Sequence, residues 1–138
     1  MPSPIVCRLP APHKPLLDKF YKAQRMPMKA QPSAAWWVVR APEVVAAMNL
    51  QPLAEGGHWL TGLLVASEHR GQGLARRLLE HGCAGAGPVW LFCQPGLEGF
   101  YQRLGFAQVG EALPAGLRER LQRYRRGKAL LAMGGEFG

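Results

Sequence analysis

Acidic side chains are scarce in this sequence of 138 residues, which has 9 Asp+Glu against 17 Lys+Arg and a formal net charge of +8. Such an excess of positive charge favours an anionic partner, and nucleic acid, a phosphorylated cofactor or an acidic substrate would all fit it. Cysteine is scarce too. Cys7, Cys83 and Cys93 form an odd set without C-x-x-C spacing, which argues against a disulfide framework and against a zinc site.

Long apolar runs are also missing from the sequence. No stretch approaches the roughly 18 apolar residues of a membrane span, and the start at residues 1–4 lacks the pattern of a secretory signal. The four histidines are scattered, without the spacing of paired metal ligands. These observations favour a cytoplasmic protein with reduced thiols, with no metal and no membrane partner.

The composition predicts one domain over residues 1–138, because domains usually have roughly 100–150 residues and 48% of the chain is hydrophobic. Apolar periodicity gives the expected elements. Strands are expected at 5–9, 36–40, 44–50, 59–66, 89–93, 106–109 and 129–133, and helices at 12–26, 74–82, 97–104 and 117–126. This order predicts an α/β (α+β) domain with a mixed sheet.

The segment 63–79 combines the end of a strand, a turn with two glycines and the start of a helix. The first N–H groups of such a helix lack helical partners and lie at the positive end of its dipole. Glycines allow a phosphate to approach the backbone, and Arg70, Arg76 and Arg77 add positive charge. The pattern predicts an anion site; a tight turn with solvated arginines is the alternative.

Two common phosphate motifs do not fit this loop. A dinucleotide fingerprint would need glycine at position 76, which is Arg76, and an acidic residue about 20 positions later, where residues 89–93 have none. A P-loop would need a G-K-[ST] triplet, which does not occur in the sequence. The loop therefore predicts a phosphate on another kind of molecule.

The loop resembles the pyrophosphate-binding motif of the GCN5-related N-acetyltransferases (GNAT), Q/R-x-x-G-x-G/A. Arg70, Gly73 and Ala75 occupy its three fixed positions. The resemblance is good over residues 59–106 and only topological outside that span.

A second motif of this family also has a counterpart. There, a polar residue, usually Asn, lies seven positions before a tyrosine in a helix that ends L-G-F. In this sequence the residues are Gln94, Tyr101 and Leu104-Gly105-Phe106. Gln94 departs from the usual Asn, and it also fits a polar residue at the end of a strand with no ligand.

The resemblance implies a mostly antiparallel central sheet flanked by helices, with a V-shaped cleft between the strands that end near Val65 and Cys93. It implies an acetyl-CoA-dependent N-acetyltransferase that acts on a primary amine of a small molecule or peptide, by direct attack in a ternary complex. Many relatives form dimers, which leaves a homodimer open. The implied cofactor-binding residues are Leu64, Val65, Arg70, Gly71, Gln72, Gly73, Leu74, Ala75, Arg76, Gln94 and Tyr101.

By the same resemblance, Tyr101 is the general acid that protonates the departing CoA thiolate. A phenol with a pKa near 10 can protonate a thiolate with a pKa near 8.5 as charge develops. A backbone amide near Val65 would stabilise the oxyanion. On its spacing alone, Tyr101 also fits a core aromatic on a stripe with Leu97 and Phe100.

The general base is harder to assign. An alkylammonium with a pKa near 10.4 must lose its proton at pH 7, at a cost of about 4.6 kcal/mol, whereas an α-amino group with a pKa near 7.7–8.0 needs almost no base. Strands 59–66 and 89–93 lack the carboxylate that family members often use. His58 is the nearest group with a suitable pKa, although it also fits a surface turn; Glu55 and Glu43 are further candidates.

Other readings stay open. The resemblance implies that residues 26–33, with Trp36 and Trp37, line the acceptor site; they also fit the core. The chain could bind acyl-CoA without transferring it, and a covalent route through Cys93 lacks a visible activating partner. Nucleic-acid binding is the least favoured function, because a solvated helix face or contact with the cofactor or a partner subunit also explains the basic residues. These are Arg118, Arg120, Arg123, Arg125, Arg126 and Lys128.

Overall fold

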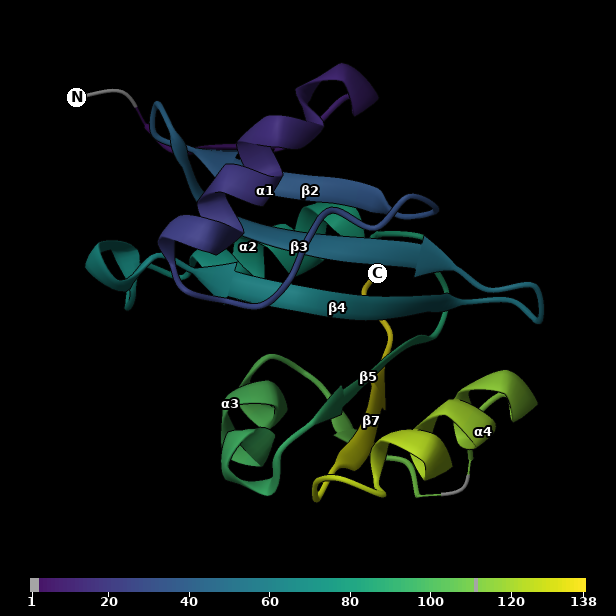
Figure 1. Ribbon diagram of the computed structural model, residues 1–138. Helices are drawn as coiled ribbons and strands as arrows, with labels where there is room; N and C mark the ends of the chain where they lie inside the picture. The colour runs from purple at the N-terminus through teal and green to yellow at the C-terminus, as the bar shows by residue number, and fades with distance from the viewer. Residues whose placement is uncertain (1–2, 111) are drawn as a thin grey trace.

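Seven strands form one open sheet in the computed structural model, which describes residues 3–110 and 112–138 (Figure 1). The strands are β1 (Ile5–Arg8), β2 (Ala35–Arg40), β3 (Val44–Pro52), β4 (His58–Val65), β5 (Val89–Cys93), β6 (Ala107–Gln108) and β7 (Leu131–Gly135). Their order is β1-β2-β3-β4-β5-β7-β6, and neighbours pair antiparallel except β4 and β5, which are parallel. The predicted mixed sheet is confirmed.

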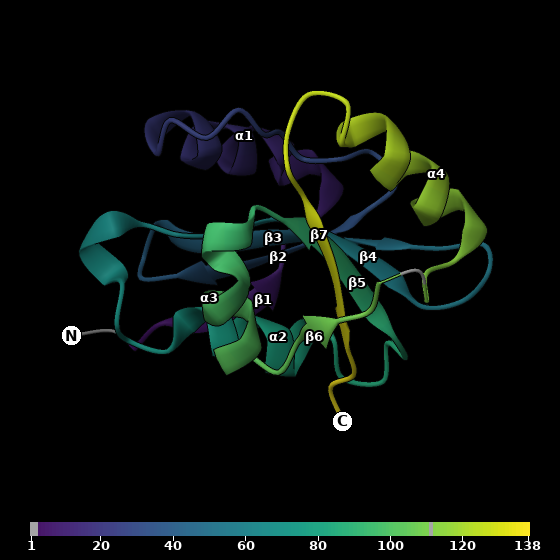
Figure 2. The same ribbon diagram turned by 90° about the horizontal axis from the view of Figure 1, so that it is seen from below.

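Helices cover both faces of this sheet (Figure 2). On one face lie α1 (Lys14–Ala23) and α4 (Ala115–Tyr124), and on the other α2 (Leu74–Gly82) and α3 (Glu98–Arg103). The predicted elements are present. α2 and β5 have the predicted bounds, whereas the others have shifted ends; the helix expected over 117–126 begins at Ala115. Within residues 3–110 and 112–138, none of the helices has the length and apolar character that a membrane crossing requires.

Amphipathic spacing explains how the helices attach. α1 buries Leu17, Phe20 and Tyr21 on the sheet. On the opposite face, α2 buries Leu74, Ala75, Leu78 and Leu79. In both helices the buried residues recur at three- and four-residue intervals, which is the apolar stripe of a helix that covers a core. The sheet between them is therefore covered on both sides. β5 is covered on both faces too, by the cluster that contains α2 and by the cluster that contains α4, as its nearly all-apolar sequence predicts.

The sheet opens between β4 and β5. In the described part of the chain only the first two residues of β4 pair with β5. Beyond them β5 diverges from β4 and runs obliquely beside β7 (Figure 1). The two parallel strands therefore form the V-shaped cleft expected between the strands that end at Val65 and Cys93.

A β-bulge interrupts β4 beside this cleft. Asn49 of β3 pairs with Thr61 and Ala47 pairs with Leu64, so that one residue of β3 faces two of β4. Gly62 lies in the bulge with φ +64°, and a Cβ there would lie 2.7 Å from the Tyr21 hydroxyl oxygen. Both the backbone conformation and the space therefore require glycine at this position.

Candidate active site

The predicted anion site lies where β4 is followed by α2. Gly73 precedes the helix with φ +74°, and the first helical bond joins the Arg77 N–H to the Gly73 carbonyl. The N–H groups of Leu74, Ala75 and Arg76 thus have no acceptor within their own helix, and they lie at the positive end of its dipole. An anion can accept these donors without displacing other bonds.

The three arginines of this segment have different positions. The Arg70 Nε donates to the Val65 carbonyl oxygen at 3.4 Å, beside the cleft. Arg76 donates to the carbonyl oxygen of Arg103 and so joins the start of α2 to the end of α3. Arg77 donates to the Pro4 carbonyl oxygen at 3.0 Å, so its expected contribution to the anion site is not observed.

A cavity of about 600 Å³, which we call the cofactor cavity, extends from this loop along the end of β4 to α3. Exposed Leu97 and Phe100 lie at its α3 side and give it an apolar wall that sequence reasoning did not assign. Among described residues, Gln72 and Gln94 of the predicted set do not line it. The predicted residues that do are Leu64, Val65, Arg70, Gly71, Gly73, Leu74, Ala75, Arg76 and Tyr101.

The Val65 amide faces the cleft. The next amide, that of Ala66, donates to the Val45 carbonyl oxygen of β3 at 2.8 Å. Successive amides of a strand point to opposite neighbours, so the Val65 N–H points away from β3. On that side β5 has already diverged. Among the residues that the structure describes, this amide has no backbone partner, and it lies beside the cofactor cavity.

The Leu104-Gly105-Phe106 sequence fixes Tyr101 at the end of α3. The Phe106 N–H donates to the Tyr101 carbonyl oxygen at 3.1 Å, and the Gly105 N–H donates to that of Gln102 at 3.1 Å. This pair of bonds is the Schellman motif, in which the residue after the glycine also contacts the last helical turn. The rings of Phe106 and Tyr101 lie edge to face at 5.9 Å.

Tyr101 is half-buried, and its surroundings keep it protonated. Desolvation, with a smaller contribution from nearby Cys93, raises the pKa of Tyr101 to about 12. The phenol therefore stays a proton donor throughout the neutral and mildly alkaline range.

A second cavity of about 730 Å³ lies on the α4 side of the cleft, and we call it the α4 cavity. Tyr101 and Leu63 line both cavities, so the two meet at this pair of residues. The α4 cavity also contains residues of the loop between α1 and β2, together with basic side chains of α4. Its lining includes Met28, Gln31, Trp59, Arg120, Arg123 and Lys128.

A buried polar network supports the wall between the two cavities. The Tyr21 hydroxyl donates to the carbonyl oxygen of Gly62 at 2.7 Å and accepts from the Asn49 Nδ2 at 3.1 Å. The Asn49 Oδ1 accepts from the Gln31 N–H at 2.8 Å. Sequence reasoning missed this network, although a glycine and an asparagine within apolar strand patterns were signals of it.

Trp36 and Trp37, which the resemblance placed near the acceptor, belong to the core. Trp36 is buried under α1, and its Nε1 donates to the Gln31 carbonyl oxygen at 2.9 Å. Trp37 packs on the opposite face, against the cluster that contains α2. Trp36 thereby helps to position the loop between α1 and β2, because its bond holds Gln31 in place.

The three candidate bases lie apart from Tyr101. The His58 Nδ1 lies 2.8 Å from the Ala86 carbonyl oxygen at the start of β4, and among described residues His58 lines neither cavity. Glu55 lies close to Gly116 of α4, and Glu43 lies in the turn between β2 and β3. The structure does not bring a base from this set to the cleft.

Cys93 does not have the character of a nucleophile. It is buried, its Sγ lies 3.6 Å from the Met133 Sδ, and desolvation together with Glu98 raises the pKa of its thiol. Such a group is inert as a thiolate at neutral pH. In the described residues no group of three or more His, Cys, Asp or Glu side chains is placed to hold a metal ion.

A protein-family model matches this chain. The family model described as "Acetyltransferase (GNAT) domain" matches residues 32–108. The chain belongs to this family of acetyltransferases, so it is an acyltransferase. No curated protein sequence matches it.

Solved structures share the fold at low sequence identity. An acetyltransferase of the GNAT family from Staphylococcus aureus Mu50 has a TM-score of 0.70 at 13% identity, with 99% of this chain and 100% of that chain covered. Arabidopsis thaliana Naa50 in complex with the bisubstrate analogue CoA-Ac-MVNAL has a TM-score of 0.68 at 15% identity, over 98% and 99%. N-acetylglutamate synthase from Neisseria gonorrhoeae, complexed with coenzyme A and N-acetyl-glutamate, has a TM-score of 0.69 at 16% identity, over 100% and 36%.

Proposed function

We propose that this chain transfers the acetyl group of acetyl-CoA to a primary amine, by direct attack of the amine in a ternary complex. One observation carries the proposal: Tyr101 lines both cavities at the place where they meet. A donor bound on one side and an acceptor bound on the other would react beside its hydroxyl. A ternary complex needs no covalent enzyme intermediate, in agreement with the inert environment of Cys93.

The residues of the cofactor cavity suit acetyl-CoA. The free amides at the start of α2 and the Arg70 guanidinium offer donors to a pyrophosphate. The apolar wall of Leu97, Phe100 and Leu104 suits the pantetheine arm. Acetyl-CoA bound in this way would supply the activated acyl group, and its thioester could reach Tyr101 at the end of the cavity.

In the reaction, the amine nitrogen forms a bond to the thioester carbon while the bond from carbon to sulfur breaks. The Val65 N–H is placed to stabilise the negative charge on the carbonyl oxygen. The Tyr101 hydroxyl donates its proton to the departing sulfur and recovers one from solvent. Exclusion of water around Tyr101 helps this transfer, because a desolvated thiolate binds a proton more tightly.

The proton of the attacking amine leaves to water in the α4 cavity. In the described residues, this cavity is lined by neither carboxylates nor histidines, and Arg120, Arg123 and Lys128 are on its wall. Nearby positive charges lower the pKa of an ammonium group and so favour the neutral, nucleophilic amine. The charge of the cavity therefore reduces the need for a dedicated base.

The test is thiol release from acetyl-CoA by the Tyr101→Phe variant, with a panel of amines. We expect kcat to fall about 100-fold, the usual range for loss of a general acid, while acetyl-CoA still raises the melting temperature as it does in the unmodified chain. Unchanged kcat with retained binding would contradict the assigned role. If the chain binds acetyl-CoA but transfers its acetyl group to no amine, the chain is an acyl-CoA-binding module instead.

A further inference from the structure

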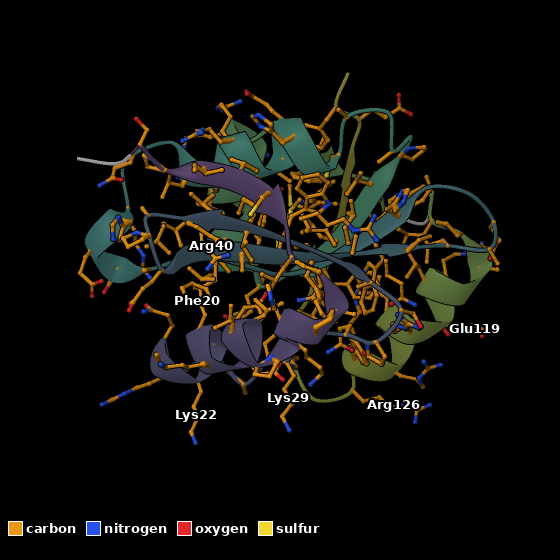
Figure 3. All side chains as sticks on the ribbon, turned by 90° about the horizontal axis from the view of Figure 1, so that it is seen from above. Phe20, Lys22, Lys29, Arg40, Glu119 and Arg126 are labelled. Carbon is orange, nitrogen blue, oxygen red and sulfur yellow. The ribbon has the colours of Figure 1, made fainter. Side chains whose placement is uncertain are left out.

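The wall of the α4 cavity is cationic because of how α4 is oriented. Leu117 and Leu121 are buried against the sheet. Arg120 and Arg123, three positions apart, then share the face that lines the cavity, and Lys128 joins them from the segment that follows. Figure 3 shows that Glu119 points away from the body of the molecule.

Arg120 is held in place by an aromatic ring. Its Cζ lies 4.2 Å from the centre of the Trp59 ring, and its side chain is half-buried. A guanidinium stacked on tryptophan keeps its planar donors available at its edge. Within the described residues the ion pair of the chain joins Lys14 and Asp18, so the donors of Arg120 and Arg123 face the cavity without a carboxylate partner.

This arrangement selects among amines. A polyamine would bring further positive charge to a wall that already has three cations. An amine with a carboxylate or phosphate on the same molecule would instead pair that group with the guanidinium groups, which bind both anions through paired N–H donors. Gln31, Gln51 and Thr61 add neutral hydrogen-bonding groups to the lining.

We propose that the acceptor is a small amine with an anionic group, a carboxylate or a phosphate ester, which binds Arg120 and Arg123 while its amino nitrogen faces Tyr101. The inference rests on the proposed function, since it places the acceptor in the α4 cavity. A volume of about 730 Å³ accommodates a molecule the size of an amino acid.

Matched amine pairs test the proposal. γ-Aminobutyrate is compared with its amide, and phosphoethanolamine with ethanolamine, each by thiol release in the presence of acetyl-CoA; spermidine serves as the polyamine. We expect the acidic member of at least one pair to have a kcat/KM about 10-fold or more above its neutral partner, as one charged hydrogen bond provides. The pair that shows the difference distinguishes carboxylate from phosphate.

Paired variants locate the effect. The double variant R120Q/R123Q should lose the preference for the acidic amine. R118Q/R126Q, which removes the same charge from exposed positions outside the cavity lining, should keep it. Arg126 points outward in Figure 3. Equal kcat/KM within both pairs, a preference for spermidine, or a preference that survives in R120Q/R123Q would overturn the proposal.

Calorimetric titration of the same amines into the CoA-loaded protein separates this inference from the proposed function. Binding of an acidic amine that is not acetylated, lost in R120Q/R123Q, would refute the proposed function and support the anionic site. Acetylation of neutral amines alone would support the proposed function and overturn the inference of an anionic acceptor. If no acidic amine is either bound or acetylated, the inference is overturned.

Discussion

The Tyr21 hydroxyl joins three parts of the molecule, and its removal should destabilise the fold measurably. Tyr21 is fully buried, and its oxygen connects α1 with the bulge carbonyl of Gly62 and with the Asn49 side chain. Burial raises the pKa of this hydroxyl, so it stays neutral and donates to Gly62. Tyr21→Phe would leave the half-buried Gly62 carbonyl and the buried Asn49 amide N–H without this partner.

The magnitude follows from these two groups. A buried polar group that loses its partner costs about 1–3 kcal/mol and a half-buried one costs less, so the variant should lose about 2–4 kcal/mol of its free energy of unfolding. For a domain of this size, that is a fall of roughly 7–14 °C in melting temperature. We also expect KM for the acceptor amine to rise, because Asn49 no longer holds the Gln31 amide as firmly.

Thermal unfolding of Tyr21→Phe beside Tyr124→Phe is the assay. Tyr124 is 43% exposed, so the loss of its hydroxyl should change stability by less than about 0.5 kcal/mol. If the two variants melted within a degree or two of each other, the argument that this network supports the wall between the cavities would be refuted.

Three further predictions concern the site. Because burial raises the pKa of Tyr101 to about 12, its ionisation should not cause a fall in kcat between pH 9 and pH 10.5; a fall in that range that is absent in Tyr101→Phe would contradict the assignment. Gly73→Ala should lose about 1–2 kcal/mol of its free energy of unfolding and bind acetyl-CoA more weakly, because φ +74° is strained for alanine. Gly96→Ala is the control, because a Cβ there meets open space and should leave stability and affinity unchanged. Equal melting temperatures and affinities of the two variants would contradict the role of Gly73. Cys93→Ala should retain kcat within about threefold, and a loss as large as that of a removed nucleophile would support a covalent route.

The parts of the fold that depend on local sequence were predictable. The apolar run of β5 gave its exact bounds, and the turn at Gly73 gave the start of α2. The L-G-F sequence placed Tyr101 in the last turn of a helix, because glycine ends a helix through bonds formed within a few residues. In these cases the determining contacts lie close together along the chain.

Contacts between distant segments could not be predicted in this way. The bond from Tyr21 to Gly62 spans 41 positions, and each partner alone has an ordinary explanation. The basic residues of α4 fitted a solvated helix, and only the placement of α4 beside Trp59 turns Arg120 into the cavity. The ordinary pKa of histidine makes His58 a candidate base from the sequence, but the parallel pairing of β4 with β5 places it beside Ala86.

The most direct test of the central claim is the distance between the Tyr101 hydroxyl oxygen and the sulfur of CoA in a crystal structure of the complex. The account predicts hydrogen-bond distance, about 3.5–4 Å for a sulfur acceptor, with the pyrophosphate on the N–H groups at the start of α2. A sulfur beyond the reach of Tyr101, or a pyrophosphate bound away from these amides, would contradict it.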